Sequence, residues 1–240
     1  MTVKELQPNP VALITGASEG IGLSVSRELS RLGYAVIITA RSASKLLDVV
    51  QAINKDGGDA VALPGDLTNE TDMNRIIHDA ESWRGGVDVL VNNAGIGYLK
   101  SFLEHTQTEY DRMFALNVRA PFALMRALIP RMIERGGGDV VNVLSGAARQ
   151  PVWADSVYGA TKASLRMMAD VIRMELNGQN IRMLTVHPGP TDTGFFAHAG
   201  KSVNAEKFIK PEDIARMIGE ILCLDRRASI TEIDIRPTEA

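Results

Sequence analysis

The sequence is poor in several features that mark particular classes of protein. Cysteine occurs once, at Cys223, among 240 residues, which excludes an internal disulfide framework and a cysteine-rich metal site. No run of 18 apolar residues is present, so no stretch of the sequence predicts a transmembrane helix. The formal net charge is only −3, which indicates neither a nucleic-acid-binding surface nor one for anionic lipid.

Other absences bear on location and on metals. The first ten residues, MTVKELQPNP, contain no apolar core of a secretory signal, and we expect a cytoplasmic protein. His78, His105 and His198 show no metal-ligand spacing, so no metal site is expected. Cys223 lies in an apolar helical run, where a buried and unreactive thiol is expected.

What is present suits a protein with a large core. The chain is 45% hydrophobic and 23% charged, as expected for one domain spanning 1–240. Short apolar runs bounded by Gly and Pro alternate with amphipathic segments, which predicts a single Rossmann-type α/β domain. We expect a doubly wound parallel sheet of about seven strands with helices on both faces. The expected strands are 11–15, 34–40, 61–65, 87–91, 139–144, 182–186 and 230–235.

A glycine-rich turn follows the first expected strand and opens a helix that runs to about Leu32. It reads Gly-Ala-Ser-Glu-Gly-Ile-Gly over residues 16–22. Glycines allow close approach of the backbone to a pyrophosphate, and the helix N-terminus offers free N–H groups and a positive dipole end. The pattern therefore predicts a dinucleotide phosphate site. Its expected members are Gly16, Ser18, Glu19, Gly20, Ile21 and Gly22.

Arg41 stands at the end of the second expected strand, nineteen residues after Gly22. In a dinucleotide-binding fold this point faces the ribose 2′ position, where an acidic residue selects NAD and an arginine accommodates the 2′-phosphate of NADP. No Asp or Glu occupies residues 39–44, so the sequence favours NADP over NAD. The alternative is a solvated arginine that precedes the expected helix 42–53.

Polar and small residues follow the third and fourth expected strands. Asp66 and Leu67 come after the third strand, and Asn93, Ala94 and Gly95 come after the fourth. Ligands of open α/β sheets bind at the carboxyl ends of the strands, which makes these residues cofactor-binding candidates. Asp66 could meet the adenine, or it could cap the expected helix 70–83.

Tyr158 and Lys162 lie four residues apart on the expected helix 157–177, with Ser145 thirteen residues before Tyr158. Residues at that spacing share a helix face. A neighbouring cation lowers the pKa of a phenol, which ordinarily is about 10. The pair is therefore a candidate acid/base unit. Its alternative is an ordinary surface pair on a helix.

Seven motifs together resemble the short-chain dehydrogenase/reductase family, in its single-domain branch similar to 3-oxoacyl carrier-protein reductases. They occur in the family's order and span nearly the whole chain. The motifs are TGASEGIG (15–22), DLT (66–68), NNAG (92–95), Asn117 within ALNV, Ser145, YGATK (158–162) and HPGPTDT (187–193).

The resemblance implies an NAD(P)-dependent oxidoreductase that acts on a carbonyl or secondary alcohol. It implies a catalytic set of Asn117, Ser145, Tyr158 and Lys162, in which Tyr158 donates or accepts the proton. Lys162 would also bind the nicotinamide ribose, and Asn117 would interrupt its helix and anchor a water molecule. Around the nicotinamide, the resemblance places Pro188, Gly189, Thr191 and Thr193. His187 is interpreted as structural, because Tyr158 supplies the proton.

The expected substrate pocket is mainly apolar. A flap over it is expected at residues 190–210, where helical periodicity is weak. Such a pocket suits a small ketone, an aldehyde, or a 3-oxoacyl or 3-hydroxy acid compound. The pocket candidates are Ser145, Ala147, Gln150, Trp153, Tyr158 and Phe195, with Ile96, Gly97, Tyr98 and Val152 beside them.

Two other functions stay open at this point. One is a non-catalytic NADP-sensing or scaffold protein, and the other is an epimerase or dehydratase on the same fold. The expected partner is a small carbonyl compound, with no nucleic acid or membrane. The resemblance also implies a homodimer or homotetramer that pairs through the long helices expected at 109–128 and 157–177.

Overall fold

A seven-stranded parallel sheet forms the centre of the computed structural model, in the order β3-β2-β1-β4-β5-β6-β7. The structure describes residues 9–239. The prediction that residues 1–10 contain no secretory signal therefore falls mostly outside the described residues. Starting from β1, the chain adds β2 and β3 on one side of the sheet and β4 to β7 on the other. The place beside β1 where the strand order changes direction is the switch point of a doubly wound fold. The predicted fold class is confirmed.

The strands form where the apolar runs predict them. Their bounds are Val11–Thr15 (β1), Ala35–Thr39 (β2), Asp59–Ala62 (β3), Val89–Asn92 (β4), Gly138–Val143 (β5), Ile181–Pro188 (β6) and Glu232–Ile235 (β7). The third strand begins and ends earlier than the predicted 61–65. Pro64 lacks an N–H group, so the ladder of hydrogen bonds cannot continue through it.

Helices connect these strands. They are Gly20–Arg31 (α1), Ala43–Lys55 (α2), Glu70–Ser82 (α3), Gln107–Phe114 (α4), Ala120–Glu134 (α5), Ser156–Glu175 (α6), Phe195–His198 (α7) and Pro211–Leu222 (α8). Asn69 caps α3, because its side chain accepts a hydrogen bond from the Asp72 N–H. Asp66, the predicted cap candidate, instead accepts hydrogen bonds from the N–H and hydroxyl of Thr68.

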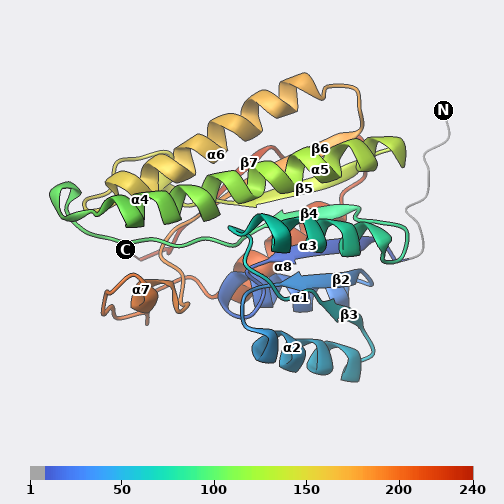
Figure 1. Cartoon of the computed structure of the whole chain (residues 1–240), viewed down its shortest axis with the longest axis horizontal. Coiled ribbons are helices and arrows are strands. Elements are labelled where there is room, and N and C mark those ends of the chain that lie inside the picture. The colour runs from blue at the N-terminus through green and yellow to red at the C-terminus, as the bar shows by residue number, and fades with distance from the viewer. Residues whose placement is uncertain (1–8, 240) are drawn as a thin grey trace.

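Helices lie on both faces of the sheet (Figure 1), and a hydrophobic layer fills the space between the sheet and the helices on each face. Alternate residues of a strand point to opposite faces. Ile14 of β1 therefore packs in one layer with α1, α2 and α8, whereas Leu13 packs in the other with α3, α5 and α6. Both side chains are fully buried. Helices cover the two faces, so the carboxyl ends of the strands stay open at one edge.

The long helix predicted at 109–128 is interrupted. A π-helical turn, Ala115–Arg119, separates α4 from α5 and contains Asn117. Pro121 follows in the first turn of α5, where its missing N–H costs least. The predicted local break at Asn117 is therefore present. The helix also continues six residues past the predicted end, with Pro130 inside it.

Two further observations concern accessibility. Cys223 is exposed, so the prediction of a buried thiol is wrong: α8 ends at Leu222, and the next residue turns out of the apolar face. Within residues 9–239, no helix is both long and apolar enough to cross a membrane.

Candidate active site

A cavity of about 1090 Å³ opens at the carboxyl ends of the strands. Its lining brings together nearly all of the predicted site, from Gly16 in the glycine turn to Phe195 in α7. Two predicted residues, Gly22 and Asn117, are absent from the lining. The predicted residues that line it are Gly16, Ser18, Glu19, Gly20, Ile21, Arg41, Asp66, Leu67, Asn93, Ala94, Gly95, Ser145, Ala147, Gln150, Trp153, Tyr158, Lys162, Pro188, Gly189, Thr191, Thr193 and Phe195.

The glycine turn is held against the segment that follows β4. Thr15 Oγ1 accepts hydrogen bonds from the N–H groups of Asn93 (2.9 Å) and Ala94 (3.0 Å). Asn93 Nδ2 donates to the carbonyls of Thr15 (2.8 Å) and Gly16 (3.2 Å). Gly16 has a φ of +66°, and a Cβ atom there would lie 2.9 Å from Ala94 Cα. Only glycine meets both conditions without strain.

The N-terminus of α1 faces the cavity without a side-chain cap. The N–H groups in the first turn of a helix have no partner within the helix. Gly22 supports this arrangement from behind, because a Cβ atom there would lie 2.5 Å from Asn93 Nδ2 and from the Gly16 oxygen. Its role is to let α1 approach the turn closely, so it is a packing residue here and not a lining one.

Arg41 follows β2 and is exposed at the edge of the cavity. Lys45 lies nearby on α2, but its Nζ pairs with Glu19 Oε2 at 2.8 Å. That contact, mainly through its hydrogen bond, lowers the pKa of Glu19. Glu19 also meets His198 Nδ1 at 3.4 Å. Lys45 therefore has an acidic partner, whereas Arg41 has none among the contacts of the described residues.

Tyr158 and Lys162 are buried side by side on α6, with 7% and 4% of their surface exposed. Lys162 Nζ lies 5.7 Å from the centre of the Tyr158 ring and donates to the Val143 carbonyl at 3.1 Å. The alternative of a surface pair is therefore wrong. Burial raises the pKa of Tyr158, while the Ser145 hydroxyl acts in the opposite direction.

That direction corrects the prediction that Lys162 lowers the pKa of Tyr158. Both groups are enclosed by low-dielectric surroundings, which disfavour the charged forms of a phenol and an amine alike. Burial accordingly lowers the pKa of Lys162 to about 8. In the protein without ligands, Tyr158 therefore holds its proton at neutral pH.

Asn117 is buried in the π-helical turn and binds protein atoms. Its Oδ1 accepts from the Ile96 N–H at 2.9 Å, and its Nδ2 donates to the Ile96 carbonyl at 2.8 Å and to Thr161 Oγ1 at 3.0 Å. The side chain thus fixes the loop after β4 against α6. These contacts use both N–H groups of the amide and one of the two acceptor positions of Oδ1, so the water-anchoring role implied by the resemblance stays a prediction.

Ser145 lies two residues after the end of β5 and is held from two sides. Its Oγ accepts from the Ala147 N–H at 3.1 Å, and its carbonyl faces His187 Nδ1 at 3.1 Å. The His187 ring is fully buried, with Nε2 2.8 Å from Glu232 Oε1. The His187 ring therefore links the Ser145 carbonyl to Glu232. His187 contacts Ser145 and not the cavity.

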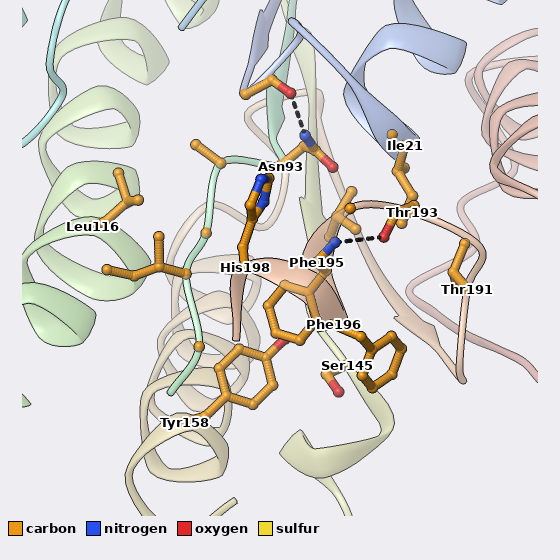
Figure 2. Close-up of a pocket in the computed structure, with 18 of the residues that line it drawn as sticks. Ile21, Asn93, Leu116, Ser145, Tyr158, Thr191, Thr193, Phe195, Phe196 and His198 are labelled. Atoms are coloured by element: carbon orange, nitrogen blue, oxygen red, sulfur yellow. Dashed lines mark hydrogen bonds between the residues drawn. The ribbon is translucent and has the colours of Figure 1, made fainter. Parts of the chain in front are cut away.

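The segment 190–210 folds over the cavity. Thr191 pairs with Ile209 at its base, and α7 carries Phe195 into the interior. Figure 2 shows the Phe195 ring beside the Tyr158 ring, and the two ring centres are 5.3 Å apart. A Cβ atom on Gly97 would lie 2.7 Å from Phe195 Cζ. Phe195 therefore shapes the space directly in front of Tyr158.

The cavity also contains charged residues that the sequence did not single out as site residues. They are Lys45 from α2, Arg112 from α4, Asp155 before α6, His198 and Lys201 from the segment 190–210, and Arg236 after β7. One signal could have found Arg236: it directly follows the last strand, and carboxyl ends of parallel strands share one edge. Within residues 9–239, no group of three His, Cys, Asp or Glu side chains could hold a metal ion.

Comparison with known proteins places this arrangement in a family. Residues 10–204 match the short chain dehydrogenase family. The ketoacyl reductase HetN of Nostoc sp. (strain PCC 7120) is 38% identical over 177 residues, which cover 74% of this chain and 62% of that protein. The chain thus spans less than two thirds of that relative's length.

Solved structures agree in fold over almost the whole length. An alcohol dehydrogenase from Thermococcus sibiricus, complexed with 5-hydroxy-NADP, has a TM-score of 0.89 at 27% identity, covering 96% of this chain and 97% of that one. A 3-ketoacyl-(acyl-carrier-protein) reductase from Brucella melitensis, complexed with NADH, has a TM-score of 0.86 at 30% identity, covering 95% and 97%. The protein belongs to the short-chain dehydrogenase/reductase family and is an oxidoreductase.

Proposed function

We propose that the protein is an NADP(H)-dependent oxidoreductase that reduces a carbonyl group with Tyr158 as the proton donor. One observation carries the proposal. Ser145 and Tyr158, thirteen residues apart in the sequence, line the same cavity, and Lys162 is buried beside the Tyr158 ring. A proton donor and a second hydroxyl that face one cavity can serve a single substrate oxygen.

The residues of the cavity fit a nicotinamide dinucleotide. The uncapped first turn of α1 and the positive φ of Gly16 leave backbone N–H groups and open space where a pyrophosphate would bind. Thr193 lies over this turn, 3.2 Å from where a Cβ atom on Gly20 would stand. We assign the pyrophosphate to residues 16–22, the adenine side to Asp66 and Leu67, and the nicotinamide side to Pro188, Gly189, Thr191 and Thr193.

Arg41 supports the choice of NADP. A guanidinium can meet a phosphate with a planar pair of N–H donors. Arg41 lies at the cavity edge after β2 without an acidic partner among the described contacts. NADP-type cofactors bound to a relative of the same fold agree with this choice, although another relative binds NADH.

The proton chemistry rests on the chain's own groups. Tyr158 holds a proton on its phenol oxygen, because burial disfavours the phenolate. Ser145 donates a hydrogen bond to the substrate oxygen as negative charge develops there, and Tyr158 delivers the proton. Lys162 supplies positive charge behind the phenol. When bound, the cofactor supplies the hydride. A protonated Tyr158 suits reduction as the working direction.

The substrate is a small ketone, an aldehyde or a 3-oxoacyl compound. Phe195, Ile96, Tyr98 and Trp153 line the cavity on the side of Ser145 and form an apolar wall. The relatives named for ketoacyl and 3-ketoacyl reduction support a 3-oxo compound. The segment 190–210 acts as the substrate flap, since Phe195 must share its space with the substrate.

We further propose a homodimer or homotetramer. On the outer side of α6, Met167 and Met174 are 61% and 78% exposed, and Val171 lies between them. Phe122 on α5 is also exposed. Side chains at this helical spacing form an apolar stripe that a second copy could cover. Sedimentation of the purified protein tests this proposal, and a monomer at micromolar concentration would contradict it.

The reaction is tested by incubating the purified protein with NADPH or NADH and a panel of ketones, aldehydes and 3-oxoacyl thioesters. NADPH consumption with one carbonyl class, faster than NADH consumption, is expected from Arg41. Cofactor binding without consumption across the whole panel would contradict the reductase proposal, and equal rates with both cofactors would contradict the preference for NADP.

A further inference from the structure

Arg236 places a guanidinium group at the substrate end of the cavity. It directly follows β7 and lines the cavity. Both of its terminal nitrogens lie 3.9 Å from the point where a Cβ atom on Gly146 would stand, and Gly146 is the residue after Ser145. The Gly189 N–H donates to the Ile235 carbonyl at 2.7 Å, which fixes the end of β7 beside the Pro188–Gly189 turn.

The acidic groups near Arg236 are shared with other cations. Arg236 donates to Asp234 Oδ1 at 3.3 Å, but Asp234 also pairs with Arg149. Glu232, the other carboxylate of β7, binds Arg166 at 2.6 Å. Three guanidinium groups therefore share two carboxylates.

The surrounding groups do not remove this surplus of positive charge. Glu232 also binds the His187 ring and meets Arg149 at 3.6 Å, and among the contacts of the described residues Arg236 pairs with Asp234 and not with Glu232. Asp155 is the other carboxyl group near Tyr158 in the lining, and within residues 9–239 it makes no ion pair with Arg236. The substrate end of the cavity thus favours an anionic group.

The position of Arg236 indicates where that anionic group lies in the substrate. Gly146 directly follows Ser145, and the guanidinium lies beside Gly146, so an anionic group close to the carbonyl held by Ser145 is the one that could reach Arg236. A guanidinium matches a carboxylate in plane and spacing. Phe195 and Trp153 also line the cavity and could contact a short apolar chain.

We propose that the substrate is a short oxo acid, a 2-oxo or 3-oxo carboxylate, and that Arg236 binds its carboxylate. This inference rests on the proposed function and narrows it. In the reaction, the carbonyl carbon gains a hydride from the reduced nicotinamide and the oxygen gains the Tyr158 proton. The product is the corresponding hydroxy acid, and the carboxylate is unchanged.

The first test compares two substrates with one carbon skeleton, acetoacetate and its uncharged methyl ester, with NADPH in excess. We expect the wild-type kcat/KM to be at least about tenfold higher for the acid. Arg236→Gln should lower kcat/KM for the acid at least about tenfold, mainly through KM, and leave the ester within about twofold. Arg227→Gln, an exposed arginine outside the cavity lining, is the matched control and should change neither.

A second measurement does not depend on turnover. Calorimetric titration of the NADP-loaded protein with malonate, a dicarboxylate without a ketone, should give a Kd at least about tenfold weaker in Arg236→Gln than in wild type. Arg236→Lys keeps the charge and should recover part of the affinity. If Arg236→Gln is unstable, kcat/KM of Arg236→Lys for the acid and for the ester is compared with that of the wild type. A loss for the acid alone would show that the planar guanidinium, and not only its charge, binds the carboxylate.

Several outcomes would overturn the inference and leave the proposed function standing. One is reduction of the ester as fast as the acid by the wild type, and another is an equal loss for both substrates in Arg236→Gln. A preference for (2-oxopropyl)phosphonate over acetoacetate would assign Arg236 to a phosphoryl group instead of a carboxylate. Only inactivity toward every carbonyl compound would overturn the proposed function itself.

Discussion

The two halves of the cavity are built in different ways. On the side of β1 to β4, backbone groups and short side chains join the glycine turn to the segment after β4, through Thr15 and Asn93. On the side of β5 to β7, long side chains dominate: Phe195 lies against Tyr158, and arginines share the carboxylates of β7. Backbone contacts keep the same geometry whatever the side chains are, so the cofactor half suits a single ligand. In the substrate half, side chains make the contacts, so amino-acid substitutions there can change which substrate binds.

The comparison predicts that a change in the substrate half stops turnover and spares cofactor binding. Tyr158→Phe removes the proton donor and leaves the ring packed on Phe195. We expect kcat to fall at least about 100-fold, with the Kd for NADPH within about twofold by fluorescence titration. Tyr110→Phe, on an exposed part of α4, is the control. Turnover near the wild-type rate in Tyr158→Phe would refute the proton-donor role.

A change in the cofactor half should do the reverse and alter cofactor choice. Arg41→Asp replaces a phosphate-binding charge with one that repels the 2′-phosphate of NADP. The ratio of the Kd for NADP to that for NAD should rise at least about tenfold, measured by titration of both cofactors. Lys55→Asp makes the same charge change at the far end of α2. An unchanged ratio in Arg41→Asp would show that NADP preference lies elsewhere.

The boundary between the two halves depends on Asn117. Replacing it with Ala leaves the partly buried N–H and carbonyl of Ile96 without their partners. The free energy of unfolding should fall by about 3 kcal/mol, measured by urea denaturation. Asn177→Ala, at an exposed position after α6, should cost little. A loss of activity with stability unchanged would instead favour the water-holding role that the sequence predicts.

The smallest expected effect concerns the charges that hold the substrate half. Arg166, with help from His187, lowers the pKa of Glu232 from 4.5 to about 2. Because the folded-state pKa is depressed, this carboxylate stabilises the protein fully above pH 4.5 and loses its contribution as the pH falls toward 2. Glu232→Gln should therefore lower the Tm by about 3 °C at pH 7, and the difference should disappear near pH 2.

Its control is Glu206→Gln, an exposed carboxylate in the segment 190–210. That variant should leave the Tm unchanged at both pH values. A Tm difference for Glu232→Gln that stays constant between pH 7 and pH 2 would show that the residue acts through packing and not through its charge.

The sequence by itself determined the sheet, the glycine turn and the pairing of Tyr158 with Lys162. These follow from local patterns, namely buried apolar runs, glycines at a strand end and a helical spacing of four, which need no knowledge of distant residues. The family resemblance added Ser145 to this pair. The family motifs also predicted which residues form the cofactor half. They could do so because backbone groups at fixed positions in the chain make its contacts.

Only the tertiary structure decided the chemistry of the other half. The direction of the Tyr158 pKa depends on how fully α6 is buried, which a spacing cannot express. Asn117 finds its partners in Ile96 and Thr161, residues 21 and 44 positions away. Arg236 meets Ser145's neighbour across 90 residues because parallel strands end at one edge of the sheet. Long side chains reach such places only after the sheet has assembled, so their roles cannot be assigned from the sequence alone.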